Sequence, residues 1–333
     1  MLPRNPPPLS PAAYIRRSSD GTPRPFSVAC IVVCLAGTWT LAAPVAAQIV
    51  PAAPPAITMG QGAVFIESVV VDEDGTWYGY YRMEVPAEQC GRPDRALPRI
   101  GAARSEDKGE SWRDLGIILE APPGWYDCNT TNQYFVGGVG NVSAMLDHRS
   151  KDLYLYFTQY SKPRTAQGVA LARLAWADRD APVGRVSVFY AGSWLGAEAT
   201  VSDDDNGDMH LDFIYSAGTP LVEVEHPWHD GDAAVDAFWG ASVHWNPSLQ
   251  LYVMLLNRTR DEQFTQEGVY VSFAKRLDDL SAWTTPMKIV DGETAAPETI
   301  GLDSGEFPDR RPPARARLFR GDSSSSYIEF NAR

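Results

Sequence analysis

The stretch SEDKGESW, residues 105–112, places serine, lysine and tryptophan among acidic side chains, and its interpretation decides how the rest of the chain is read. The residues before it, RIGAARS, and after it, WRDLGIILE, have the alternating or β-branched character of strands. Charged residues and a glycine between two such runs are typical of a turn. We therefore interpret residues 105–112 as a turn that reports the fold, and not as an active site.

Strand-like runs joined by short turns continue through the chain, with almost no helical periodicity. AVFIESVVV (63–71) leads through DEDG into TWYGYYRME (76–84), which predicts a hairpin. The order strand, turn, aromatic-rich strand, loop, strand, turn and tryptophan-containing strand occurs three times, at residues 63–120, 139–192 and 239–290.

A repeated four-stranded unit of about 50 residues is the signature of a β-propeller blade. We predict an all-β, five-bladed β-propeller over residues 58–333. Residues 196–224 would form an irregular third blade, and residues 293–333 a short last one. A two-sheet sandwich is the structural alternative, but it explains the strands without explaining the repeated unit.

The first 57 residues differ from this pattern. Arginines precede an apolar run, FSVACIVVCLAGTWTLAAPVAAQ (26–48), which contains the small-residue sequence VAA. These features predict a signal peptide at residues 1–47, cleaved near Ala47, and a Pro/Ala linker at residues 48–57. An N-terminal membrane anchor is the alternative. We expect a secreted or periplasmic protein with no membrane span in its mature form.

Charge narrows the range of partners. Residues 1–47 hold four arginines and one aspartate, so the rest of the chain has 25 basic and 41 acidic residues, a net charge of −16. Such a surface repels nucleic acid and anionic lipid. We expect a monomer with a neutral or cationic ligand.

The two cysteines of the mature part, Cys90 and Cys128, predict a disulfide, because exported proteins favour oxidised thiols. Free thiols or a two-cysteine metal site are the alternatives. The Cα atoms of a disulfide should lie about 4.4–6.8 Å apart.

The opening stretch, S-x-D-x-G-x-x-W, resembles the Asp-box of sialidase-type and related propellers at every fixed position. The resemblance implies that Ser105 and Asp107 bind backbone amides of the turn, that Gly109 takes a positive φ and that Trp112 packs between strands. It also implies a peripheral turn between the third and fourth strands of a blade. SFAKRLDDLSAW (272–283) is similar to a degenerate copy.

Two longer stretches, VVVDEDGTWYGYYRM (69–83) and GVYVSFAKRLDDLSAWTTPMKIV (268–290), resemble the five-bladed propellers of arabinanase, β-xylosidase and other furanosidase-type glycoside hydrolases. The chain also resembles a group of secreted bacterial propellers with motifs such as FVGGVG (135–140). The glycoside hydrolase families use three acids near the starts of innermost strands. Glu67 fits the base, but Asn141 stands where an aspartate would be expected, and Glu198 begins the third blade.

The catalytic candidates are Glu67 and Glu267, two carboxylates that begin or interrupt apolar strands, where an unpaired charge is costly to bury. A structural ion pair is the alternative for each, with Arg258 as the expected partner of Glu267. Trp239 is a candidate sugar platform or a core residue, and His244 a candidate ligand-binding or core histidine. The further substrate-binding candidates are Arg258, Asn141, Asp236 and Asp127.

We predict no metal and no cofactor. DDDNGD (203–208) has the composition of a calcium loop but lacks the trailing glutamate, so a solvated turn is the preferred interpretation. HPWHD (226–230) has two histidines three apart and no third ligand.

The sequence therefore predicts an exported propeller that acts on or binds a carbohydrate, with glycosidic-bond hydrolysis by paired carboxylates if it is catalytic. The alternative is a non-catalytic glycan-binding or assembly propeller that has lost the triad. Asn141 favours this alternative, whereas a carboxylate there would favour catalysis.

Overall fold

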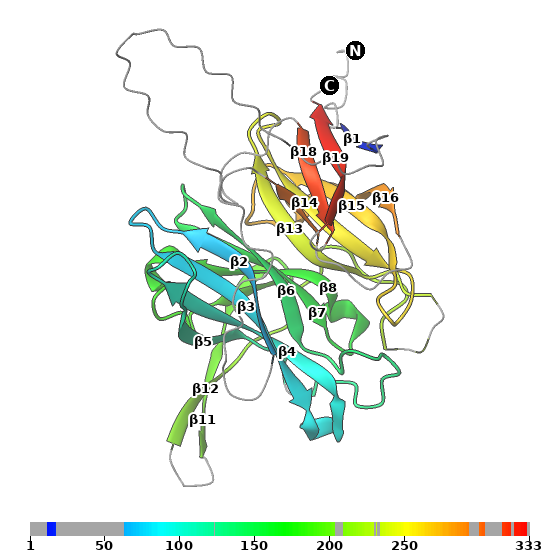
Figure 1. Ribbon diagram of the computed structural model, residues 1–333. Coiled ribbons are helices and arrows are strands. Elements are labelled where there is room, and N and C mark those ends of the chain that lie inside the picture. The colour runs from blue at the N-terminus through cyan, green and yellow to red at the C-terminus, as the bar shows by residue number, and fades with distance from the viewer. Residues whose placement is uncertain are drawn as a thin grey trace, which may run out of the picture.

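A computed structural model describes residues 12–17, 63–122, 124–203, 209–229, 231, 234–292, 300–303, 315–320 and 323–331. Antiparallel strands form five sheets (Figure 1). In spatial order, the first sheet contains β2 (Ala63–Val71), β3 (Trp77–Ala87), β4 (Arg92–Ser105) and β5 (Arg113–Leu119). The second contains β6 (Val139–Asp147), β7 (Asp152–Tyr160), β8 (Gln167–Ala175), β9 (Ser187–Tyr190) and β10 (Ser193–Gly196).

The third sheet is a hairpin of β11 (Glu198–Asp203) and β12 (Met209–Ile214). The fourth contains β13 (Phe238–Asn246), β14 (Leu251–Thr259), β15 (Gln266–Ala274) and β16 (Met287–Asp291). The fifth contains β17 (Ile300–Asp303), β18 (Arg315–Arg320), β19 (Ser323–Asn331) and β1 (Ala12–Arg17). Single 3-10 turns are η1 (Glu88–Cys90), η2 (Arg164–Ala166), η3 (Trp176–Asp178) and η4 (Leu280–Ala282).

The first strands of three sheets, β2, β6 and β13, lie side by side as the inner strands. The hydroxyl of Ser68 accepts a hydrogen bond from the backbone N–H of Ala144 at 2.9 Å, and the hydroxyl of Ser143 accepts one from Val243 at 3.0 Å. Two equivalent serines therefore link neighbouring inner strands: Ser68 links β2 to β6, and Ser143 links β6 to β13. This arrangement and the four-stranded sheets confirm the all-β, propeller-type fold predicted from the sequence.

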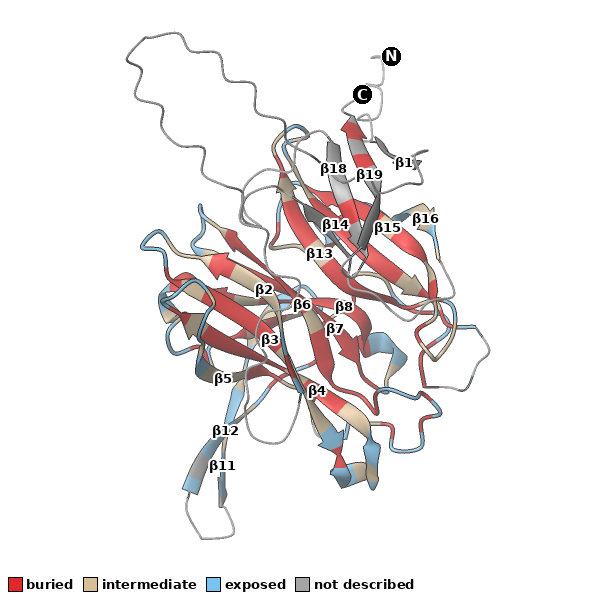
Figure 2. Ribbon diagram, in the orientation of Figure 1, coloured by how far each residue is buried: buried red, intermediate tan, exposed pale blue. Residues whose placement is uncertain are grey.

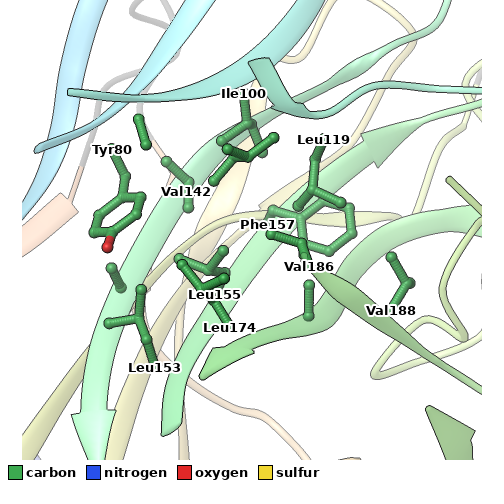
Figure 3. Packing of buried hydrophobic residues seen from close by; sticks show 14 of the residues in the cluster. Tyr80, Ile100, Leu119, Val142, Leu153, Leu155, Phe157, Leu174, Val186 and Val188 are labelled. Carbon is green, nitrogen blue, oxygen red and sulfur yellow. The ribbon is translucent and has the colours of Figure 1, made fainter. Parts of the chain in front are cut away.

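The hydrophobic core lies between the sheets. Tyr80, Ile100 and Leu119 of the first sheet pack against Leu155 and Phe157 of the second (Figure 3). A second cluster joins the second sheet to the fourth, and buried residues follow the middles of the strands while the turns are exposed (Figure 2). Successive side chains of β7 alternate between the two clusters, since Leu155 and Phe157 lie in the first and Tyr154 and Tyr156 in the second.

Residues 196–224, predicted as an irregular third blade, do not form a four-stranded sheet. Strands β11 and β12 pair as a hairpin, which projects from the other sheets and leaves Val201, Met209 and Leu211 exposed (Figure 1). The direct bond from Val243 to Ser143 shows that no blade separates β6 from β13. The described part of the segment forms a sheet of only two short strands, β11 and β12, whereas a blade needs four.

Residues 12–17, inside the predicted signal peptide, form β1, which pairs with β19 from Ala12↔Asn331 to Arg17↔Ser326. The remainder of residues 1–47 and the linker at residues 48–57 lie outside the described residues, and the signal peptide stays a prediction. In the described part of the chain no helix has the length and apolar character needed to cross a membrane.

Candidate functional site

Glu67 lies at a break in the pairing of the innermost strand of the first sheet. The β2–β3 register shifts between Ile66 and Ser68, so Glu67 occupies a β-bulge. Its Oε2 accepts the backbone N–H of Val142 at 2.8 Å, and its Oε1 lies 3.4 Å from the side-chain amide of Asn141. The β6–β7 register shifts at the same place, between Gly140 and Ser143, and the two bulges thus bring Glu67 and Asn141 together.

Arg82 of β3 is shared between two carboxylates. Its Nε lies 3.0 Å from Glu67 Oε1, and its Nη1 donates to Glu84 Oε1 at 2.5 Å. The guanidinium also lies over the ring of Phe65, 5.0 Å from its centroid. Gly140 makes room for this side chain, because a Cβ there would lie 2.7 Å from Arg82 Cδ. Glu67, Arg82 and Glu84 thus form one ionic cluster.

Burial has the largest single effect on the pKa of Glu67 and on that of Arg82. It raises the pKa of Glu67, and the Arg82 charge and the Val142 N–H offset only part of that effect, to which the neighbouring Glu84 adds. Burial lowers the pKa of Arg82, but the two carboxylates outweigh it and the net shift is upward. Burial also raises the pKa of Tyr160, which stays protonated and donates a hydrogen bond to Asn141. A buried carboxyl group with a raised pKa beside a second carboxylate is a common feature of functional sites.

A cleft of about 410 Å³ opens beside Glu84. Its polar lining comes from Glu84, Asp94, Arg95 and Gln133, and its aromatic lining from Tyr134 and Phe135. Tyr134 is 40% exposed, and its ring also contacts the rings of Phe135 and Phe264. This shallow cleft therefore combines one partly exposed aromatic residue with several hydrogen-bonding side chains.

The aromatic wall of the cleft is positioned by pairing with the first sheet. The backbone N–H of Ala96 donates to Tyr134 O at 2.8 Å, and the Val136 N–H donates to Ala96 O at 3.2 Å. The same loop is tied to η1 by the disulfide Cys90–Cys128, whose Cα atoms lie 5.0 Å apart. The predicted disulfide is thus confirmed, and it fixes the segment that carries Tyr134.

An aromatic contact connects the cleft to the buried cluster. Phe135 lines the cleft and packs on Tyr160 with 4.4 Å between ring centroids. Tyr160 in turn donates to Asn141, which contacts Glu67. Contacts therefore run from the cleft to Glu67 by two routes, through Glu84 and Arg82 and through Phe135 and Tyr160.

Glu267 lies in the fourth sheet with its own partners. Lys288 Nζ donates to its Oε1, and Tyr270 Oη donates to its Oε2 at 2.7 Å. Burial raises the pKa of Glu267, but the two hydrogen bonds, together with the charges of Lys288 and Arg258, outweigh it and the net shift is downward. The predicted partner, Arg258, instead pairs with Asp236 at 3.7 Å. Asp236 also accepts hydrogen bonds from the backbone N–H groups of Glu225 and His226, so the Arg258–Asp236 ion pair helps to anchor that loop.

The remaining predicted site residues are mostly buried. Trp239 is 4% exposed and packs against Phe264, so its ring face is covered. His244 bonds to the Ser242 hydroxyl at 2.7 Å, and burial lowers its pKa to about 4. Asp127 accepts the Asn129 N–H at 3.1 Å and lies 3.6 Å from Lys162 Nζ, in the loop that walls the cleft. For Trp239 and His244, these contacts match the core alternative that the sequence left open.

Of the two histidines in residues 226–230, His229 is held by hydrogen bonds at both ring nitrogens. His229 Nδ1 lies 2.7 Å from the Thr130 hydroxyl and its Nε2 lies 2.8 Å from Tyr160 O, so both ring nitrogens are used in hydrogen bonds. Across the described ranges no group of three or more histidine, cysteine or acidic residues is placed to hold a metal ion. The predicted calcium-like loop, residues 203–208, lies almost entirely outside the described residues.

Residues 105–112 form the predicted turn between β4 and β5. The Ser105 hydroxyl accepts the Gly109 N–H at 2.8 Å, and Asp107 Oδ1 accepts the Ser111 N–H at 2.8 Å. Gly109 has φ +89°, and the Trp112 ring fills the space over Gly79, whose Cβ would lie 2.7 Å from it. The polar side chains of the turn are therefore used to close it.

Sequence reasoning missed Glu84, Tyr134 and the central role of Arg82. The alternation in TWYGYYRME places Arg82 and Glu84 on one face of β3, which is a signal that could have been used. Tyr134 could not be located this way, because its position depends on pairing between a loop and Ala96.

No protein-family model matches the sequence, and no curated protein sequence matches it either. Among solved structures, the chain is similar to an endo-1,5-alpha-L-arabinanase from Thermotoga petrophila, with 13% identity over 80% of this chain and 55% of that one and a TM-score of 0.42. A family 43 glycoside hydrolase, the YxiA protein of Bacillus licheniformis, has 14% identity, coverages of 80% and 56% and a TM-score of 0.43. An arabinanase from Bacillus subtilis has 11% identity, coverages of 79% and 92% and a TM-score of 0.31.

The chain spans little more than half the length of the first two of these proteins. Propellers host many activities, so a likeness of this size does not assign one.

Proposed function

We propose that this chain binds a carbohydrate in the cleft lined by Glu84, Arg95, Gln133 and Tyr134. The observation that carries the proposal is the exposed ring of Tyr134 in a cleft that otherwise presents carboxylate, guanidinium and amide groups. A sugar ring has apolar C–H faces and hydroxyl edges, so an aromatic platform surrounded by hydrogen-bonding groups matches it.

The test is titration calorimetry with a set of plant and bacterial oligosaccharides against wild type and Tyr134→Ala. Loss of the stacking surface should weaken binding about 5–10-fold. Tyr190→Ala is the matched control, because Tyr190 is an equally large exposed tyrosine, 49% exposed, on β9. Binding that survives Tyr134→Ala, or is weakened as much by Tyr190→Ala, would remove the cleft from consideration.

Hydrolysis of a glycosidic bond is the second candidate, and the shared guanidinium favours it. Glu67 and Glu84 both contact Arg82, and burial raises the pKa of Glu67. Two carboxyl groups in unlike environments can divide acid and base roles. In this proposal Glu84, which borders the cleft, takes the place predicted for Glu267, because Lys288 and Tyr270 hold Glu267 in another sheet.

Aryl glycosides and polysaccharides should be assayed with wild type and three isosteric variants. If the chain is a hydrolase of this kind, Glu67→Gln and Glu84→Gln abolish turnover and Glu267→Gln leaves it unchanged. Turnover lost only in Glu267→Gln would restore the pair predicted from the sequence. Glycan binding without turnover in wild type would leave a binding protein, as Asn141 suggests.

We also propose that the chain is exported. The basic and apolar N-terminal segment supports this, and so does the disulfide Cys90–Cys128, because disulfides persist in oxidising compartments. Fractionation of cells that express the full chain should place a product shortened by about 47 residues outside the cytoplasm. A full-length cytoplasmic product would contradict the export.

A further inference from the structure

The guanidinium groups at the cleft are already paired. Arg95 donates to Asn132 O at 2.8 Å and to Asp94 Oδ2 at 2.6 Å. Behind the cleft, Arg82 lies between Glu67 and Glu84. Among the described residues of the cleft, therefore, every cation has a carboxylate partner, and an anionic substituent on a ligand would have to displace one.

Of the two carboxylates that line the cleft, Asp94 is paired with both Arg92 and Arg95, whereas Glu84 is less fully used. Glu84 Oε1 accepts from Arg82, whereas Glu84 Oε2 has no hydrogen-bond partner among the described residues. The Glu84 side chain is 27% exposed and the Asp94 side chain is 58% exposed. Tyr134, which is 40% exposed, adds an aromatic ring to the same lining. Among its described residues, the cleft thus offers a ligand one unpaired carboxylate oxygen, on Glu84, and no cation without a carboxylate partner.

We propose that the ligand of this cleft is a glycan with free amino groups, and that glycans with carboxylate or sulfate groups are excluded; the inference rests on the proposed carbohydrate-binding function. The ammonium group of an amino sugar donates to Glu84 Oε2 while the sugar ring stacks on Tyr134. The net charge of −16 outside residues 1–47 attracts such a polycation to the surface, which raises the association rate.

The experiment uses three oligosaccharides of equal length: oligomers of glucosamine, of N-acetylglucosamine and of galacturonic acid. Affinity is measured by calorimetry at low and high salt, about 0.05 M and about 0.5 M. The variants are Glu84→Gln, Tyr134→Ala and Glu110→Gln. Glu110 is an exposed acid in the turn of residues 105–112, so Glu110→Gln changes the net charge as Glu84→Gln does, away from the cleft.

We expect the glucosamine oligomer to bind about tenfold more tightly than the N-acetylated oligomer, and the galacturonate oligomer to bind least. Glu84→Gln should weaken binding of the glucosamine oligomer about tenfold and leave the affinity for the N-acetylated oligomer nearly unchanged. Glu110→Gln should change either affinity less than about twofold. Tyr134→Ala should weaken both.

Three results would overturn the inference. Equal or tighter binding of the N-acetylated or galacturonate oligomer, still weakened by Tyr134→Ala, removes the charge preference and leaves the proposed function standing. An equal loss of glucosamine affinity in Glu84→Gln and Glu110→Gln shows a general charge effect. If no oligomer binds, or Tyr134→Ala affects none of them, the inference and the proposed function fail together.

Discussion

Glu67 and Glu267 look alike in sequence, since each interrupts or begins an apolar strand, yet their surroundings differ. Glu67 lies on an innermost strand, its side chain is 12% exposed, and its contacts come from two sheets. Glu267 lies on the third strand of its sheet, its side chain is 28% exposed, and both its hydrogen bonds come from that sheet. Burial raises the pKa of Glu67, whereas hydrogen bonds lower that of Glu267 against its burial. Position within the sheet, and not residue type, decides how a carboxylate behaves.

The largest expected effect comes from removing the counter-charge of each glutamate. Arg82→Met leaves Glu67 buried without its cation and should cost about 3–5 kcal/mol of the free energy of unfolding. Lys288→Met removes a half-exposed partner from Glu267 and should cost about 0–1 kcal/mol. Urea unfolding at neutral pH measures both. Equal losses would show that the inner and outer sites are energetically alike.

His244 extends the comparison to a basic group on another inner strand, β13. Burial lowers its pKa to about 4, below the ordinary value of 6.5. The neutral form therefore stabilises the fold above about pH 6.5, and this contribution is lost as pH falls toward 4, by about 3 kcal/mol in total. His244→Gln should remove that part of the pH dependence of unfolding between pH 6.5 and 4. A profile unchanged from wild type would mean that His244 is not held neutral.

The two glutamates should have opposite effects on the pH profile. The pKa of Glu67 is raised, so its contribution to stability is fully present below its ordinary pKa of 4.5 and is lost as pH rises through the raised value. The pKa of Glu267 is lowered, so its contribution is present above 4.5 and is lost as pH falls through the lowered value. Difference curves of unfolding free energy, wild type minus Glu67→Gln and wild type minus Glu267→Gln, should therefore slope in opposite directions. Parallel slopes would contradict the pKa assignments.

Local patterns predicted most of the fold. Alternation and turn chemistry act over a few residues, so the strands of the first, second and fourth sheets match the repeated units at residues 63–120, 139–192 and 239–290. The disulfide was predictable because the chain has only two cysteines after residue 47. The hairpin at residues 198–214 was not, because its strands are too few for the repeat and its neighbours are set by contacts across sheets.

The candidate site was predictable only in part, because contacts between residues distant in sequence place several of its side chains. Glu67 and Asn141 were expected on the first and second blades, and they lie on β2 and β6, whose bulges bring them together; their role in a functional site stays a prediction. The pairing of Tyr134 with Ala96, and the burial of Trp239 beneath Phe264, depend on residues distant in sequence. A single sequence contains no local signal for such contacts.

The smallest effect on a ligand is expected at the turn of residues 105–112, farther out than either glutamate. The Ser111 hydroxyl and N–H and the Ser105 hydroxyl lower the pKa of Asp107 to about 2, and all of these partners belong to the turn. Asp107→Ala removes the acceptor that closes the turn beneath Trp112, so the melting temperature should fall. Because the lowered pKa makes the carboxylate stabilising above its ordinary value of 3.8, that difference from wild type should shrink as pH falls toward 2. The affinity of the folded fraction for a glycan should equal that of wild type, since no contact of Asp107 reaches the cleft. A loss of affinity at unchanged melting temperature would place the turn in the binding site, and the inner strands would then not be more important for binding than the outer turns.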